Sequence, residues 1–162
     1  MCGIVGYVGQ KKALPILLNS LKALEYRGYD SAGIAYIKDK DIHIIKKQGK
    51  IKNLEQSLSI DEDTYMGIGH TRWATHGIPN EINAHPHKVG KITLVHNGII
   101  ENYEELRQEL VKDSYTFKSE TDTEVVAALI DKIYQKKHDM LKTLDKVTNK
   151  LEGTYAFGII CE

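Results

Sequence analysis

Only two cysteines occur among the 162 residues of the chain, Cys2 and Cys161, and they lie at opposite ends of the sequence. This spacing is typical of neither a disulfide framework nor a zinc motif. The chain also lacks net charge, because 22 basic residues balance 22 acidic ones. Electrostatics therefore gives no reason to expect nucleic acid or an anionic membrane as a partner.

Long hydrophobic runs are missing as well, since none approaches the roughly 20 residues that a membrane span requires. The N-terminus lacks the basic flank and apolar core of a secretory signal. A length of 162 residues suits one domain with one substantial core. We therefore expect a single soluble domain over residues 1–162, located in the reducing cytoplasm and without a nucleic-acid or membrane partner.

The first nine residues, MCGIVGYVG, place a cysteine directly behind the initiator methionine. If Met1 is removed, Cys2 carries a free thiol and a free α-amine on the same residue. The amine has a pKa of about 7.7–8.0 and the thiol one of about 8.5, so the amine can accept the thiol proton near neutral pH. The alternative is a core cysteine on a buried first strand, because free cysteine is among the most buried residue types.

Hydrophobic periodicity predicts a mixture of helices and strands. The expected helices span residues 11–27, 50–58, 121–134 and 139–150, with another beginning at residue 102, and the expected strands span residues 1–9, 31–37, 41–47, 65–70, 91–96 and 153–161. Capping-box patterns open the helices that begin at Asn102 and Thr121. Because most strand connections have hairpin length, the pattern indicates an α+β fold with antiparallel sheets covered by helices.

The segment from residue 71 to residue 90, TRWATHGIPNEINAHPHKVG, has neither a helical nor a strand period. A loop of this length in a compact domain is usually functional or disordered, and the tryptophan in it favours order. We therefore expect a substrate loop. Its histidines, with His70 and His96 nearby, suggest a metal site only weakly, because they lack the i, i+4 helical spacing or the carboxylate and thiolate ligands of such sites.

Six segments, read in order, carry a resemblance to a known family: MCGIVGYVG, LEYRGYDSAGIA, GIGHTRWATHG, NAHPH, VHNGIIENYEELR and SETDTEV. Over nearly the whole chain they resemble the glutaminase domain of class II glutamine amidotransferases. The second segment is similar to the glucosamine-6-phosphate synthases of that class. Purine amidophosphoribosyltransferases tend to carry a histidine before Arg-Gly and Gln-Glu after it, where this chain has Tyr26 and Tyr29-Asp30. Asparagine synthetases depart further.

The resemblance implies a four-layer αββα sandwich of the N-terminal-nucleophile hydrolase type, with two antiparallel sheets between helical layers. It also implies that Cys2 is the nucleophile that attacks the carboxamide of L-glutamine. Asn97 and Gly98 then correspond to the oxyanion hole, where one donor is worth on the order of 3–4 kcal/mol of barrier. The alternative reading of this pair is an ordinary Asn-Gly turn.

Further residues match the family's glutamine contacts. Arg72 can grip the α-carboxylate with its planar fork, although a surface salt bridge in a loop is the simpler role. Asp122 can hold the α-ammonium at a helix start, where a carboxylate is also favourable without any ligand. Trp73 corresponds to a cover over the site and the ammonia route, or to a packing residue, and Thr75 and His76 correspond to additional substrate contacts.

The family needs no metal or other cofactor. In the full enzyme the ammonia passes to fructose 6-phosphate in a C-terminal sugar-phosphate isomerase part, which we expect to be absent from residues 1–162. We expect the parent enzyme to be a homo-oligomer and the isolated domain to be monomeric. Two rival functions remain open: a glutaminase that feeds a purine acceptor, and a module that binds glutamine without turnover.

Overall fold

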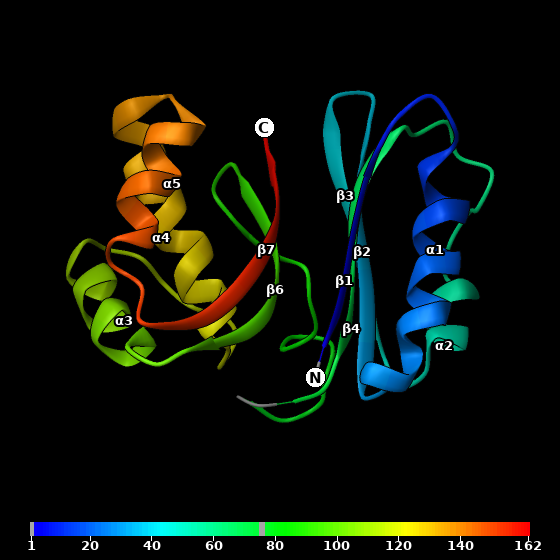
Figure 1. Ribbon diagram of the computed structural model, residues 1–162, viewed down its shortest axis with the longest axis horizontal. Helices are drawn as coiled ribbons and strands as arrows, with labels where there is room; N and C mark the ends of the chain where they lie inside the picture. Colours follow the sequence, from blue (N-terminus) through cyan, green and yellow to red (C-terminus); the bar gives the residue numbers. More distant parts are fainter. Residues whose placement is uncertain (1, 75–76) are drawn as a thin grey trace.

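The computed structural model describes residues 2–74 and 77–162. Two sheets lie face to face between two layers of helices (Figure 1). In chain order the elements are β1 (Gly3–Val8), α1 (Ala13–Leu24), a 3₁₀ turn (Glu25–Arg27), β2 (Ser31–Lys38), β3 (Asp41–Gln48), α2 (Ile51–Glu55), β4 (Met66–Arg72), β5 (His87–Val89), β6 (Ile92–Ile100), α3 (Tyr103–Lys112), α4 (Asp122–Lys137), α5 (Met140–Thr148) and β7 (Gly153–Cys161).

Every strand pair in the described part of the chain is antiparallel. One sheet has the strand order β1-β4-β2-β3 and the other the order β5-β6-β7. Helices α1 and α2 cover the outer face of the first sheet, and α3, α4 and α5 cover that of the second (Figure 1). This arrangement confirms the four-layer α+β fold that the resemblance implies.

The helix periods in the sequence explain the two outer cores. In α1, four leucines at helical spacing are at most 3% exposed and pack on the first sheet: Leu14, Leu17, Leu18 and Leu21. Helix α4 instead is buried all round from Asp122 to Asp131, because it lies against β5 and β6 on one side and against α3 and α5 on the other. A helix covered on several sides does not show a clean amphipathic period.

Close contact between layers depends on small residues in β4. A Cβ atom built on Gly67 would lie 2.7 Å from the Leu17 side chain, and one built on Gly69 would lie 3.0 Å from Leu21. Helix α1 therefore packs directly against the backbone of β4. This contact fixes the strand that ends at Arg72.

The structure corrects several boundaries. Strand β4 runs two residues beyond the expected end at His70, because Thr71 and Arg72 pair with β2. Strand β5 lies inside the segment expected to be a loop, and β6 continues through residues 97–100 instead of ending at residue 96. Local sequence misses these additions because the partner strand, not the strand's own propensity, extends the pairing.

Two smaller corrections concern helices. The expected helix over residues 50–58 is only Ile51–Glu55. The side chain of Asn102 does not cap α3; its amide nitrogen donates to the Lys150 carbonyl (2.8 Å), and its oxygen accepts from the Glu152 N–H (3.1 Å). Thr121 does cap α4, since its hydroxyl oxygen accepts from the Glu124 N–H. Among the described residues there is no helix long and apolar enough to cross a bilayer.

Candidate active site

Cys2 lies just before β1, beside the C-terminal end of β4. The next residue, Gly3, pairs with Thr71 and donates its N–H to the Thr71 hydroxyl oxygen (3.1 Å). The sulfur of Cys2 accepts a hydrogen bond from the Trp73 N–H (3.4 Å) and lies 3.6 Å from the Trp73 carbonyl oxygen. The described contacts of the sulfur are therefore with backbone, not with a side-chain base.

Burial raises the pKa of the Cys2 thiol, and the hydrogen bond from the Trp73 backbone opposes this effect only in part. A buried thiol resists ionisation because its thiolate loses hydration. The described surroundings of Cys2 do not by themselves make a thiolate at neutral pH. A base must take the proton.

Arg72 ends β4 and is only 2% exposed. Its two terminal nitrogens donate to the carbonyl oxygens of Gly77 (3.0 Å) and Ile78 (3.3 Å). One of these nitrogens also lies 3.8 Å from a carboxylate oxygen of Asp30. The backbone of Gly28 passes directly beside it, since a Cβ atom there would lie 2.6 Å from the Arg72 carbonyl.

Asn97 and Gly98 lie within β6, paired with Ala156 and Tyr155 of β7. Gly98 has a φ of +139°, which side-chain-bearing residues rarely adopt, and a Cβ atom on it would lie 2.0 Å from the Thr154 carbonyl oxygen. The pair is therefore not the turn between two strands that was the alternative reading. It is a distorted strand position that only glycine fits.

Asp122 is the first residue of α4 and is 4% exposed. One of its carboxylate oxygens accepts a hydrogen bond from the Ile100 N–H (3.0 Å), at the end of β6. The same oxygen lies 3.8 Å from Nδ1 of His96. A buried carboxylate at a helix N-terminus is favoured by the helix dipole.

Several buried histidines lie behind the Asp122 carboxylate. The Thr123 hydroxyl oxygen lies 2.7 Å from His85 Nε2 and 3.0 Å from His96 Nδ1. The His70 ring stacks on that of His85, with centroids 4.1 Å apart, and its Nε2 lies 2.8 Å from the His96 carbonyl oxygen. Because a carbonyl can only accept, His70 carries its proton on Nε2.

The rings of His70, His85 and His87, which form the histidine layer, are held uncharged at neutral pH. Burial lowers the pKa of His70 to about 3 and lowers the pKa values of His85 and His87 well below the ordinary range. The neighbouring positive charge of Arg72 adds to the effect. The layer therefore supports the site as neutral hydrogen-bonding groups. Among residues 2–74 and 77–162, no group of three or more His, Cys, Asp and Glu side chains is placed to hold a metal ion.

Two cavities meet at Cys2. The first is lined by residues that include Cys2, Arg72, Gly98 and Asp122, and its volume of about 10 Å³ is near the minimum for one water molecule. The second, of about 600 Å³, is lined by Cys2, Trp73, Asn97 and residues of β7. Its volume lies in the range of small-molecule sites. The thiol is therefore not buried away from Arg72, Asn97 and Asp122, which would have ruled out the site.

The structure also brings in residues to which the sequence assigned no role. Asp30 accepts hydrogen bonds from the Ala74 N–H and the Ser31 hydroxyl (2.9 Å), so it fixes the loop that follows Arg72. Its signal in the sequence is its place directly after the Arg-Gly-Tyr turn. His85 and Thr123 lie in two of the segments that carry the resemblance, NAHPH and SETDTEV, but neither was assigned a role at the site. The expected contacts Thr75 and His76 lie outside the described residues.

Comparisons with known proteins find a matching family model and similar sequences with related names. A family model described as glutamine amidotransferase domain matches residues 70–162. The glutamine–fructose-6-phosphate aminotransferase (isomerizing) of Clostridium perfringens is 55% identical over 164 residues, which cover 99% of this chain and 27% of that protein. The protein of the same name from Aquifex aeolicus is 55% identical over 163 residues, with the same coverage. The chain thus spans about a quarter of the length of these curated relatives.

A solved structure shares the architecture. The glutamine phosphoribosylpyrophosphate amidotransferase from B. subtilis, complexed with ADP and GMP, matches with a TM-score of 0.83 and 28% identity. The match covers 98% of this chain and 35% of the other. This fold is therefore shared with a protein named for phosphoribosylpyrophosphate, whereas the two relatives compared above by sequence are named for fructose 6-phosphate.

Proposed function

The chain belongs to the glutamine amidotransferase domain family, and on this premise we propose that it hydrolyses L-glutamine to glutamate and ammonia through a γ-glutamyl thioester on Cys2. The observation that carries the proposal is the meeting of Cys2, Arg72, Gly98 and Asp122 around one cavity. These residues supply a nucleophile, a cation, an N–H donor and an anion. That is the set of groups that an amide substrate with a zwitterionic head requires.

The reaction begins when the α-amine of Cys2, freed by removal of Met1, accepts the thiol proton. The thiolate attacks the carboxamide carbon and forms a C–S bond. The tetrahedral intermediate collapses, the C–N bond breaks, and the ammonium of Cys2 returns the proton to the departing ammonia. Water then attacks the thioester, releases glutamate and restores the thiol. The α-amine is proposed as the base because the described contacts of the sulfur are all with the Trp73 backbone.

The oxyanion of the intermediate is stabilised by the Asn97 side-chain amide and the Gly98 N–H. Such donors act strongly in a site that excludes water, because they are held in place before charge develops. The backbone conformation of Gly98, which a Cβ atom would oppose by meeting the Thr154 carbonyl, sets the direction of this N–H. We assign the α-carboxylate of glutamine to Arg72 and its α-ammonium to Asp122.

We expect substrate binding to displace Gly77 and Ile78 from Arg72. The guanidinium of Arg72 donates to the carbonyl oxygens of Gly77 and Ile78, which occupy donors that the glutamine carboxylate would use. The cavity of about 10 Å³ beside Arg72 is also too small for the substrate. The carboxylate of glutamine therefore replaces these two backbone carbonyls on the guanidinium of Arg72. Thr75 and His76 are proposed as contacts in the resulting complex.

We further propose that the ammonia serves the synthesis of glucosamine 6-phosphate from fructose 6-phosphate in the longer enzyme. Support comes from relatives that are 55% identical and are named for this acceptor. The structural neighbour named for phosphoribosylpyrophosphate is only 28% identical. A C-terminal isomerase part would use the ammonia, within a homo-oligomeric parent enzyme.

A glutaminase assay tests the first step. Chain with Met1 verified as absent by intact mass should release glutamate from glutamine, and Cys2→Ala should release none because the nucleophile is gone. Cys161→Ala is the matched control, since this second free cysteine lies at the far end of the chain in β7. It should keep the full rate.

The same samples separate turnover from simple binding. An electrophilic glutamine analogue should add its mass once, at Cys2, in the wild-type chain and in Cys161→Ala. If the Met-free chain binds glutamine but neither releases glutamate nor reacts with the analogue, the protein is a glutamine-binding module and the proposed hydrolysis is wrong.

A further inference from the structure

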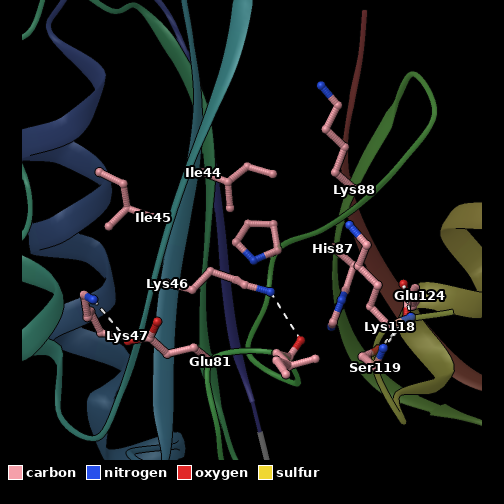
Figure 2. Close-up of a pocket in the computed structure, with 12 residues that line it drawn as sticks. Ile44, Ile45, Lys46, Lys47, Glu81, His87, Lys88, Lys118, Ser119 and Glu124 are labelled. Carbon is pink, nitrogen blue, oxygen red and sulfur yellow. Dashed lines mark hydrogen bonds and ion pairs between the residues drawn. The ribbon is translucent and has the colours of Figure 1, made fainter.

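A separate cavity of about 870 Å³ opens between β3 and the segment that leads into α4. It shares no lining residue with the two cavities that meet at Cys2. Its wall carries four lysines, Lys46, Lys47, Lys88 and Lys118, and two glutamates, Glu81 and Glu124. Figure 2 shows Lys46 reaching across from β3 and Lys118 standing on the opposite wall beside His87.

The charges of this cavity do not cancel. Lys47 pairs with Glu81 (3.1 Å), and Lys88 pairs with Glu162 (2.5 Å). Lys46 instead donates to the backbone carbonyls of Ile82 (3.3 Å) and Ala84 (2.8 Å), which satisfy its hydrogens without neutralising its charge.

The remaining carboxylate of the cavity, Glu124, is bound, among the described residues, only by neutral donors and keeps its negative charge. Glu124 accepts hydrogen bonds from the N–H groups of Lys118 and Ser119 and from the Ser119 hydroxyl. Hydrogen bonds from these three donors fix the position of the carboxylate and stabilise its charged form. Within the described chain, the ammonium of Lys118 has no ion-pair partner. Lys46 and Lys118 together outweigh the one carboxylate of Glu124, so the cavity carries one excess positive charge.

These two ammonium groups disfavour one another. Burial is the main effect and lowers the pKa of Lys46; the charges of Glu124 and Glu81 raise this pKa, and the charge of Lys118 lowers it by less than either glutamate raises it. An anion between them would relieve both the repulsion and the poor hydration of the half-buried Lys46. The excess positive charge favours an anionic ligand, and lysine binds phosphate as a point charge.

Apolar surface adjoins the two lysines. Ile82 is 58% exposed, and Ile44 and Pro86 lie beside it in the wall of the same cavity. We propose that this cavity binds an organic phosphate monoester, with the phosphate between Lys46 and Lys118 and the organic group against Ile44, Ile82 and Pro86. A site with apolar walls and a few convergent polar groups is the usual form of a small-molecule pocket.

Titration calorimetry with phenyl phosphate tests the site, because this probe joins a phosphate to a flat apolar group. The wild-type chain should bind it saturably, inorganic phosphate more weakly, and benzyl alcohol not detectably. Lys118→Met should weaken the binding about tenfold, since one charge-assisted contact is lost. Added glutamine should not compete, because the two sites share no residue.

Lys136→Met is the matched control, because Lys136 is an exposed lysine of α4 outside this cavity. It should leave the affinity unchanged. Lys46→Met should also weaken binding, but it removes the link to residues 82 and 84, so Lys118→Met is the deciding variant. Absence of saturable binding at millimolar phenyl phosphate, or equal affinity in wild type and Lys118→Met, would overturn the proposal.

Discussion

Gly98 combines the oxyanion role proposed for its N–H with a backbone shape that other residues do not adopt. Its φ of +139° and the 2.0 Å approach of a Cβ atom to the Thr154 carbonyl act together. Alanine at this position would have to strain its own backbone and push β7 away from β6. Position 98 is therefore constrained by packing as well as by chemistry.

We expect Gly98→Ala to lower the free energy of unfolding by on the order of 3 kcal/mol and to abolish glutamate release. Urea denaturation and the glutaminase assay measure the two effects. Gly6→Ala is the matched control, because a Cβ atom there would lie 3.9 Å from its nearest neighbour, an ordinary contact with Ile68. It should keep both stability and activity, and an equally stable, fully active Gly98→Ala would refute the assignment.

For single residues, the sequence identifies candidate catalytic and binding side chains more readily than it identifies which residues they contact. Cys2, Arg72 and Asp122 were predicted because their residue types match motif positions, and the structure brings all three to one cavity. Asp30 was not predicted, although it lies 3.8 Å from Arg72. Its contact depends on the pairing of β2 with β4, and no local pattern specifies that two such strands are neighbours.

The histidine layer joins β4, the segment before β5, and the start of α4 into one buried unit. The folded layer accepts no proton until the pH is far below 6.5, whereas unfolded histidines are protonated near 6.5. The unfolded chain therefore binds more protons in this interval. Stability is complete above about pH 6.5 and is lost as the pH falls toward 3.

We expect the free energy of unfolding to fall by about 2 kcal/mol for each such ring between pH 7 and pH 5. Urea denaturation at the two values measures the fall, over an interval where most carboxylates have not yet titrated. His87→Gln should reduce the fall, whereas His138→Gln, at an exposed residue, should not. Equal stability at the two pH values would show that the rings are not held neutral by burial.

The elements with strong periods were predicted well, and those defined by their partners were not. Strand β7 begins and ends where the sequence predicted, and the 31–37 and 41–47 segments form the predicted antiparallel hairpin. The end of β4, the short β5 and the last residues of β6 were missed. The end of β4 and the end of β6 gain their hydrogen bonds from strands distant in sequence, β2 and β7. Strand β5 pairs with the neighbouring β6, but a run of three residues carries little signal of its own.

At the scale of the whole molecule, the proposed glutamine site opens toward solvent. Trp73 is 48% exposed and contacts Tyr29, itself 55% exposed, with ring centroids 5.6 Å apart. Large exposed aromatic groups at the mouth of a site are typical of a surface that another part of a protein covers. In this chain alone, water can reach the proposed thioester, and released ammonia can leave.

We therefore expect this chain, supplied with glutamine and fructose 6-phosphate together, to form glutamate and free ammonia but no glucosamine 6-phosphate. It aligns with only 27% of the length of relatives named for that transfer, and we propose that the groups that bind and activate the sugar lie in the regions it does not match. Mass spectrometry of the sugar fraction and an ammonia assay measure both products, and a full-length relative provides the positive control. Formation of the amino sugar by this chain alone would mean that acceptor chemistry resides within the four layers described here.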